Sequence, residues 1–186
     1  MKIMLAAAAL VAASSVASAQ FTVYSNDFAG WAAAAGSYAT ETFTGNVINT
    51  GAFTIATGTG AINNDQFEDR LRSGETTTFT FGSAITAFGG NFDFNPGGPG
   101  IGLNLFANGV QVGSILNPSG TVAFNGFWGF TSTTAFDSVQ LVGDGQPGNA
   151  ETYNLDNVVF SAIPLPSAAG LGFVGLAGLA ARRRAR

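Results

Sequence analysis

The sequence lacks cysteine and histidine, and charged residues make up only 10% of its 186 positions. Lysine occurs once, at Lys2, and between residues 20 and 162 the only basic residues are Arg70 and Arg72. The missing histidine and lysine exclude the usual nucleophile–base arrangements from this stretch. Zinc sites built on Cys or His are excluded as well. Because no disulfide can form, burial of apolar side chains must stabilise the fold.

Negative charge is concentrated in the middle of the sequence. All eleven Asp and Glu residues lie between residues 20 and 162, so two arginines against eleven carboxylates give this body a net charge of −9. Nucleic acids and anionic membrane surfaces both favour partners rich in Lys and Arg. We therefore expect no nucleic-acid partner and no binding to an anionic lipid surface.

Residues 1–19 have the composition of a secretory signal peptide. Lys2 supplies the positive n-region, Ile3 to Val11 the apolar h-region, and Ala17-Ser18-Ala19 a cleavage site before Gln20. A transmembrane helix is the competing interpretation, but the apolar run is too short and ends in small polar residues. The segment predicts export across the inner membrane.

A second apolar segment occupies residues 163–186. It begins with Ile163-Pro164-Leu165-Pro166, continues as an uncharged run from Ala168 to Ala181, and ends in Arg182, Arg183, Arg184 and Arg186. The two prolines end the folded body, because they remove backbone donors and disfavour helix before them. The uncharged run suits a helix in lipid, and the arginines act as a stop-transfer signal that stays cytoplasmic.

In this order the three parts resemble the PEP-CTERM sorting signal of Gram-negative bacteria. Members of that family are recognised by an exosortase, a membrane transpeptidase-like protease. The resemblance covers Ile163 to Arg186, and Leu165, where the commonest form carries Glu, is similar to the Pro-Leu-Pro variant. It implies transient anchoring in the inner membrane, followed by delivery to the cell surface or the extracellular space. An ordinary membrane anchor or a buried apolar helix is the alternative, since residues 163–181 would form about 28 Å of helix.

Between these segments, residues 20–162 have the length of one domain and the composition of a β protein. Phenylalanine is abundant, with 17 in the chain, and Gly and Asn separate short apolar runs. We expect an all-β, jelly-roll-like sandwich of about ten short strands. The expected strands are residues 41–44, 52–56, 76–81, 85–95, 102–107, 110–116, 122–124, 127–131, 136–142 and 153–160. Asn108-Gly109 predicts a tight hairpin, and Gly89-Gly90 predicts a β-bulge.

One short helix is expected early in the body, at Phe28 to Ala35. Ser25-Asn26-Asp27 offers N-cap side chains, and Gly36 occupies the position where a glycine typically ends a helix. Phe28 and Trp31 are three residues apart, so they share one face of the helix. We expect that face to cover an open end of the sandwich.

The body also carries a looser resemblance in its second half. Gly126–Phe130, Phe136–Val139 and Glu151–Val158 resemble segments in the bodies of many PEP-CTERM proteins, which are similar to carbohydrate-binding modules and lectins. The resemblance implies a β-sandwich and suggests exopolysaccharide as a ligand, but the sequence does not identify the binding residues. The candidates for stacking on sugar rings are Trp31, Trp128, Tyr24, Tyr38 and Tyr153. Core packing is the alternative, and we favour it for Trp128.

Calcium is the one cofactor that the composition favours. An acidic body without histidine offers mainly hard oxygen ligands, which suit Ca²⁺. In the carbohydrate-binding sandwiches that this body resembles, calcium often joins an early strand to the last one. The resemblance therefore implies Glu41 and Asp156 as metal ligands. Alternatively, Asp156 accepts backbone N–H groups at a strand end.

We expect a surface or matrix protein that is not an enzyme and associates with exopolysaccharide in a biofilm. A carboxylate-dependent glycoside hydrolase is one alternative, because paired carboxylates alone can perform that reaction. Its candidate residues, Glu68 and Asp69, are predicted to lie in a polar loop, Asn63 to Arg70. There, surface pairing with Arg70 and Arg72 is the simpler interpretation. A purely structural matrix protein is the other alternative.

Overall fold

The computed structural model describes residues 19–72, 74–95, 102–115, 123–143 and 150–162. The signal peptide predicted at 1–19 lies outside this part except for its last residue. The sorting motif Ile163–Pro166 and the arginines at 182–184 and 186 lie outside it entirely. No helix within the described ranges has the length and apolar character needed to cross a membrane.

The described ranges contain one helix and ten strands, and the strands form one antiparallel hydrogen-bonded sheet. The elements are β1 (Phe21–Ser25), α1 (Phe28–Ala35), β2 (Ala39–Glu41), β3 (Phe53–Ala56), β4 (Ala61–Asn63), β5 (Gln66–Arg72), β6 (Thr76–Asp93), β7 (Leu103–Ala107), β8 (Val110–Ile115), β9 (Asn125–Gly143) and β10 (Ala150–Ala162).

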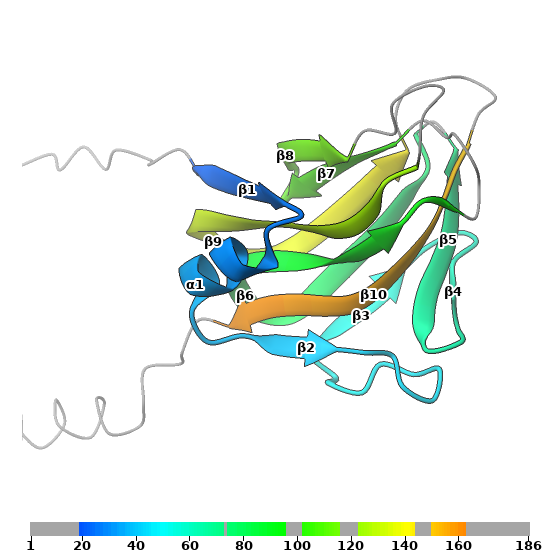
Figure 1. The fold of residues 1–186 in the computed structure, drawn as a ribbon, viewed down its shortest axis with the longest axis horizontal. Helices are drawn as coiled ribbons and strands as arrows, with labels where there is room; N and C mark the ends of the chain where they lie inside the picture. The colour runs from blue at the N-terminus through cyan, green and yellow to red at the C-terminus, as the bar shows by residue number, and fades with distance from the viewer. Residues whose placement is uncertain (1–18, 73, 96–101, 116–122, 144–149, 163–186) are drawn as a thin grey trace, which may run out of the picture.

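Two long strands, β6 and β9, fold this sheet into two layers. The second half of β6 and the first half of β9 pair with each other and with β10 and β1. With β2, β4 and β5 they form what we call the front layer, which faces the reader in Figure 1. The first half of β6 and the second half of β9 join β3, β7 and β8 in the back layer.

The bend in β6 follows from distances between side chains of the same strand. Phe79 and Phe88 are nine residues apart, which would separate them by about 30 Å along a straight strand. Their ring centroids are only 5.6 Å apart, because the two halves of β6 face each other across the core. The pairing of β6 with β9 shifts register between Thr80 and Ala87, which locates the bend.

The space between the layers is filled mainly by aromatic and aliphatic side chains. Phe79, Phe88, Phe130, Tyr153 and Leu155 are all fully buried there. This core confirms the prediction of an all-β sandwich held together by burial, without disulfides. The hairpin at Asn108-Gly109 is confirmed too, and both residues adopt positive φ angles of 46° and 77°.

Several local predictions were wrong, among them the strand expected at 122–124, since Ala123 and Phe124 belong to no strand. Gly89-Gly90 does not itself form the bulge, because both residues pair regularly with β9; the extra residue at this point belongs to β10, whose pairing with β6 shifts register between Asp156 and Val159. A second irregularity of β6 lies between Thr80 and Ala87. The predicted loop Asn63–Arg70 is instead a hairpin in which β4 and β5 are joined by Asn64 and Asp65, with φ angles of 52° and 59°. The expected strand 41–44 ends at Glu41 because Phe43 has a φ angle of 52°.

Helix α1 forms where predicted, but it covers a different part of the sandwich. The Asp27 side chain caps it by accepting a hydrogen bond from the backbone N–H of Gly30 at 2.8 Å, and Gly36 ends it. Trp31 packs with Phe127, Ala87 and Val159, whose side chains lie on the outer side of the front layer. The helix therefore lies against the face of a sheet, not over an open end (Figure 1).

Candidate functional site

An open groove of about 470 Å³ lies where α1, β2 and the front layer meet. Three strands, β6, β9 and β10, form its floor, and the helix forms one wall. Its lining residues are Phe28, Tyr38, Thr40, Asn91, Phe127, Asn157 and Val159. The groove thus combines aromatic rings with amide and hydroxyl groups, the mixture that typically binds a small polar ligand.

The aromatic wall is built from Phe28, Tyr38 and Phe127. Phe28 and Tyr38 are large rings that remain 43% and 40% exposed. The Phe28 ring meets Tyr38 edge to face at 5.9 Å and Phe127 at 5.2 Å. Such edge-to-face contacts hold aromatic rings in fixed relative orientations. Two exposed rings are therefore presented on a rigid support.

Trp31 supplies that support from beneath the two exposed rings. It is fully buried, and its indole N–H donates a hydrogen bond to the carbonyl oxygen of Phe130 at 3.1 Å. Its ring stacks on Phe28 at 6.0 Å and meets Tyr38 at 5.3 Å. Trp31 is consequently a positioning residue for the groove.

Two paired glycines allow the helix to approach the sheet this closely. Gly89 and Gly129 are register partners in β6 and β9. A Cβ atom on Gly129 would lie 3.0 Å from Trp31 Cδ1 and 2.8 Å from Phe127 Cζ, and a Cβ atom on Gly89 would lie 2.8 Å from the same Phe127 atom. Gly89, which we had expected to form a bulge with Gly90, therefore leaves room for the Phe127 ring to lie close to the backbone.

The polar side of the groove begins with a row of side chains across three strands. Phe127, Asn91 and Asp156 are successive register partners in β9, β6 and β10. The Asp156 carboxylate accepts hydrogen bonds from the backbone N–H of Asn157 at 2.6 Å and from its side-chain amide at 2.7 Å. Asn157 has a φ angle of 49°, a conformation that costs free energy and is often found at functional sites.

The environment of Asp156 affects its protonation. Burial raises the pKa of this carboxyl above its ordinary value, the hydrogen bond from Asn157 opposes that effect, and the nearby charge of Asp65 adds to it. Asp156 therefore holds Asn157 against the groove through hydrogen bonds that weaken when the carboxylate is protonated.

Glu41 and Asp156, the predicted calcium ligands, lie on neighbouring strands but on opposite faces of the front layer. Glu41 pairs with Val158, a core residue, and is fully buried. Its carboxylate accepts hydrogen bonds from the N–H groups of Phe43 at 2.8 Å and Thr50 at 2.7 Å, and from the Thr50 hydroxyl at 2.9 Å.

The two carboxylates are therefore not gathered around one ion. Within the described ranges, no three acidic side chains gather into a group that would hold a metal. Glu41 instead ties the loop after β2 to the sheet. Calcium binding stays a prediction.

Glu41 gives a testable pH dependence. Burial acts to raise the pKa of its carboxyl, but the hydrogen bonds from Thr50 and Phe43 outweigh burial and lower it below the ordinary 4.5. A depressed carboxyl pKa stabilises the fold above the unfolded-state pKa, and the stabilisation is lost as pH falls through the folded pKa. We expect Glu41→Gln to unfold at lower urea concentration than wild type at neutral pH, with the gap shrinking as the pH is lowered below 4.5. A gap that stays constant through this range would contradict this assignment.

Glu68 and Asp69, the candidate catalytic pair, point to opposite faces of β5. Asp69 faces the core and is 4% exposed, and Glu68 pairs with Asn154 on the outer side. The Asp69 carboxylate accepts hydrogen bonds from the hydroxyl groups of Thr57 at 2.6 Å, Thr59 at 2.8 Å and Thr77. Asp69 is thus a structural residue, and the two adjacent carboxylates cannot act on one bond.

Among the five predicted stacking residues, one reaches the groove. Trp31, Trp128 and Tyr153 are buried, which confirms core packing for Trp128, and Tyr24 is half-buried beside Trp31. Tyr38 lines the groove. Sequence reasoning did not assign Phe28, Phe127 or Asn91 to a ligand site. The helix spacing placed Phe28 beside Trp31, but no sequence signal placed β6 beneath them.

Comparison with known proteins defines the class of fold. No protein-family model matches the sequence, and no curated protein matches it significantly. Among solved structures, a mutant of a family 29 carbohydrate-binding module is similar over 70% of this chain and 100% of its own, with a TM-score of 0.51 and 11% identity. A second mutant of that module covers the same shares, with a TM-score of 0.47 and 12% identity.

A third similar structure is the catalytic unit of a thermostable GH87 α-1,3-glucanase from Streptomyces thermodiastaticus. It matches 68% of this chain and 26% of its own length, with a TM-score of 0.41 and 16% identity. At these identities the likeness concerns the fold alone. The body thus shares its β-sandwich fold with the family 29 module.

Proposed function

We propose that this protein binds carbohydrate in the groove between α1 and the front layer. The observation that carries the proposal is the pair of exposed rings, Phe28 and Tyr38, beside the amides of Asn91 and Asn157. Sugars offer C–H faces that pack on aromatic rings and hydroxyl groups that pair with amides. The sandwich fold, shared with a module that binds carbohydrate, supports the same ligand class.

The proposed binding geometry follows from the arrangement of the lining residues. One sugar ring packs against Phe28 and Tyr38, while its hydroxyl groups reach Asn91 and Thr40 across the groove. Because Trp31 and the paired glycines fix the rings, little side-chain entropy is lost on binding. The open shape of the groove allows a sugar within a longer chain to enter.

Replacing the exposed rings tests the proposal. Phe28→Ala and Tyr38→Ala are each expected to weaken binding by about tenfold or more, as loss of a contact worth about 1.4 kcal/mol does. Affinity gel electrophoresis on soluble glucan, mannan, xylan and chitosan measures the change. Val110→Ala removes a side chain that is 50% exposed on β8 and serves as the matched control. Equal retardation of all variants would exclude this groove, and retardation by no glycan would favour a purely structural matrix protein.

We propose that the site binds without hydrolysing its ligand. The pair that suggested hydrolysis, Glu68 and Asp69, is split between two faces of β5. Reducing sugar released from any bound glycan, and lost in a carboxylate variant, would replace this proposal with a hydrolase.

Delivery is the other half of the proposed function. We propose that an exosortase processes the segment beginning at Ile163-Pro164-Leu165-Pro166, and that the sandwich is then released to the cell surface or the extracellular matrix, where exopolysaccharide is its ligand. The three ordered parts of residues 163–186 support this proposal. Mass spectrometry of the mature protein is expected to find a C-terminus near Pro166, and an intact Arg186 on exported protein would contradict sorting.

A further inference from the structure

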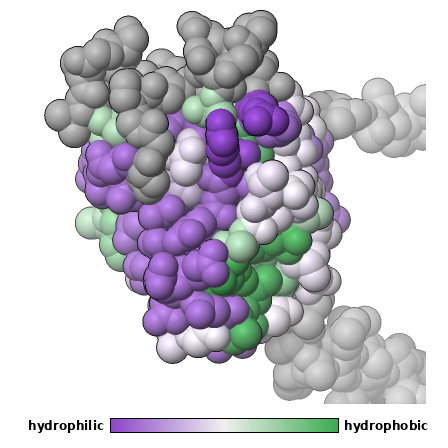
Figure 2. All heavy atoms as spheres, turned by 90° about the vertical axis from the view of Figure 1, so that its right-hand side faces the viewer, coloured by the Kyte–Doolittle hydropathy of each residue, from purple (hydrophilic) through white to green (hydrophobic). Residues whose placement is uncertain are grey.

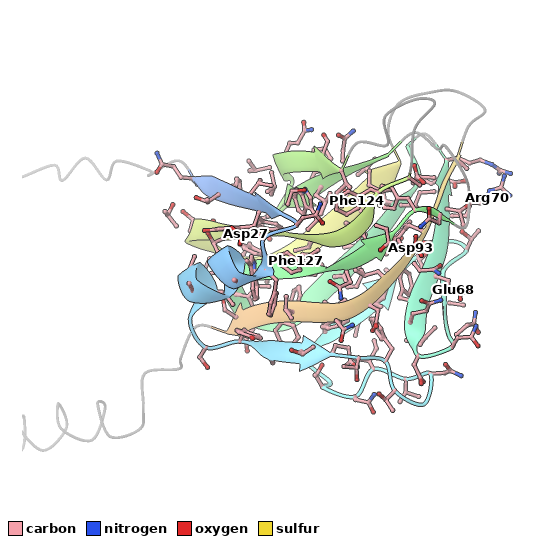
Figure 3. The ribbon with its side chains drawn as sticks, viewed as in Figure 1. Asp27, Glu68, Arg70, Asp93, Phe124 and Phe127 are labelled. Atoms are coloured by element: carbon pink, nitrogen blue, oxygen red, sulfur yellow. The ribbon has the colours of Figure 1, made fainter. Side chains whose placement is uncertain are left out.

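The polar side of the groove continues into a second row that crosses four strands. Asn125, Asp93, Asn154 and Glu68 are successive register partners in β9, β6, β10 and β5. Asp93 lies between the core residues Phe92 and Phe94, so its side chain lies on the outer side of the front layer. Figure 3 shows Phe127, Asp93 and Glu68 in this order from the helix towards β5.

This second row borders the groove directly. Asp93 is two residues beyond Asn91 on the same strand and the same face, a separation of about 6.6 Å. Asn91 lines the groove. A ligand chain that leaves the aromatic wall along the sheet therefore passes over Asp93 and Asn154 before it reaches Glu68. On the side of the molecule that carries β4 and β5, hydrophilic residues cover the left and middle of the described surface, and hydrophobic residues gather mainly at the lower right (Figure 2).

The two carboxylates in the row carry negative charge that their hydrogen-bond partners do not neutralise. Asp93 accepts from the backbone N–H of Asn95 at 2.9 Å, and Glu68 accepts from the amides of Gln66 at 3.1 Å and Asn63 at 3.4 Å. All three donors are neutral. On the described strands of this face the nearest cationic residue along β5 is Arg70, two positions from Glu68.

The spacing of these carboxylates suits a repeating ligand better than a single ion. Asp93 and Glu68 are separated by one strand, β10, so their backbones lie about 9.5 Å apart, at two strand spacings. A metal ion needs its ligands within about 2.6 Å. An oligosaccharide places successive substituents along its length, and its charged groups can reach both positions at once.

We propose that the groove and the polar row together bind a glycan that carries free amino groups, such as a glucosamine polymer. This inference rests on the proposed function and names the class of its ligand. Phe28 and Tyr38 pack on one sugar ring, and Asp93 and Glu68 pair with the ammonium groups of sugars further along. Polyanionic glycans are rejected by the same carboxylates, because like charge close to the binding surface costs affinity.

Calorimetry on the full chain tests this inference with three probes of equal length: a glucosamine hexamer, its N-acetylated form and a uronic acid hexamer. At low salt we expect the glucosamine hexamer to bind roughly threefold to tenfold more tightly than the N-acetylated one, the gain of two partly exposed ion pairs. The uronic acid hexamer is expected to bind most weakly. High salt should remove most of the difference, because it screens exposed charges.

Charge-changing variants locate the effect. Asp93→Asn and Glu68→Gln should each lower the ratio of the affinity for the glucosamine hexamer to the affinity for the N-acetylated hexamer. Arg70→Gln should increase the preference, because it removes the competing cation. Asp137→Asn is the matched control, since Asp137 is exposed on β9 outside the row.

This inference would be overturned by equal affinity for the glucosamine hexamer and the N-acetylated hexamer. It would also be overturned if both Asp93→Asn and Glu68→Gln left the preference for the glucosamine hexamer unchanged. Binding of the N-acetylated hexamer that depends on Phe28 would then leave the proposed function intact. Binding of none of the three probes would also overturn this inference, and the retardation by glucan, mannan and xylan would then decide the proposed function. Binding that does not depend on Phe28 would instead overturn the assignment of the groove.

Discussion

Trp31→Ala is expected to destabilise the protein by about 3–5 kcal/mol, the usual cost of removing a fully buried large aromatic side chain. Trp31 fills the space between α1 and the outer side of the front layer, and its loss exposes Ala87, Phe127 and Val159 to a cavity. The Phe130 carbonyl also loses its indole donor. Urea unfolding followed by circular dichroism measures the change.

The same substitution is expected to abolish glycan binding while the sandwich remains folded. Phe28 and Tyr38 both pack against Trp31, so the aromatic wall loses its support. Trp31→Phe keeps an aromatic ring in this space and is expected to lose less stability and less glycan affinity than Trp31→Ala. A destabilisation below about 1 kcal/mol for Trp31→Ala would mean that α1 does not depend on this packing.

Asp69→Ala is expected to destabilise the protein by about 3 kcal/mol, because the buried hydroxyl of Thr77 and the half-buried hydroxyl of Thr57 lose their acceptor. Thr57, Thr59 and Thr77 all donate to this carboxylate, and Tyr153 donates in turn to Thr77 at 3.2 Å. The network joins the segment between β3 and β4 to β5, β6 and β10. Burial also raises the pKa of Tyr153 well above its ordinary value, so its hydroxyl stays protonated as a donor.

Comparing the urea unfolding of Asp69→Ala with that of Asp137→Ala distinguishes loss of this hydrogen-bond network from the general effect of removing one negative charge. Both variants remove one carboxylate, but Asp137 is exposed, so its replacement should change stability by less than about 0.5 kcal/mol. Asp69→Asn retains one acceptor and should fall between the two. Similar unfolding midpoints for the two alanine variants would show that the threonine hydroxyls find other partners.

The fold class could be predicted from the sequence, because the local signals for the helix and for the hairpin match the elements of the structure. Asp27 and Gly36 delimit the helix, and Asn108-Gly109 delimits a hairpin. The lengths of β6 and β9 could not be predicted, because each strand continues through a bend at which the alternation of apolar and polar residues is interrupted. Gly82, at the bend of β6, looks like a strand end in a linear reading.

The candidate site was less accessible to sequence reasoning because its residues come from five separate segments. Tyr38 was a candidate on side-chain chemistry alone, and Trp31 was one for the same reason but is buried. Asn91 and Asp93 become part of a site only through the pairing of β6 with β9 and β10. That pairing joins residues more than thirty positions apart, and local patterns do not encode it.

A crystal structure of the protein with a bound oligosaccharide tests the central claim most directly. We predict a sugar ring packed on Phe28 and Tyr38, with hydroxyl groups paired to Asn91 and the chain continuing over Asp93. A ligand seated instead on the outer side of the back layer, around Thr78 and Gln140, would contradict the assignment of the binding surface.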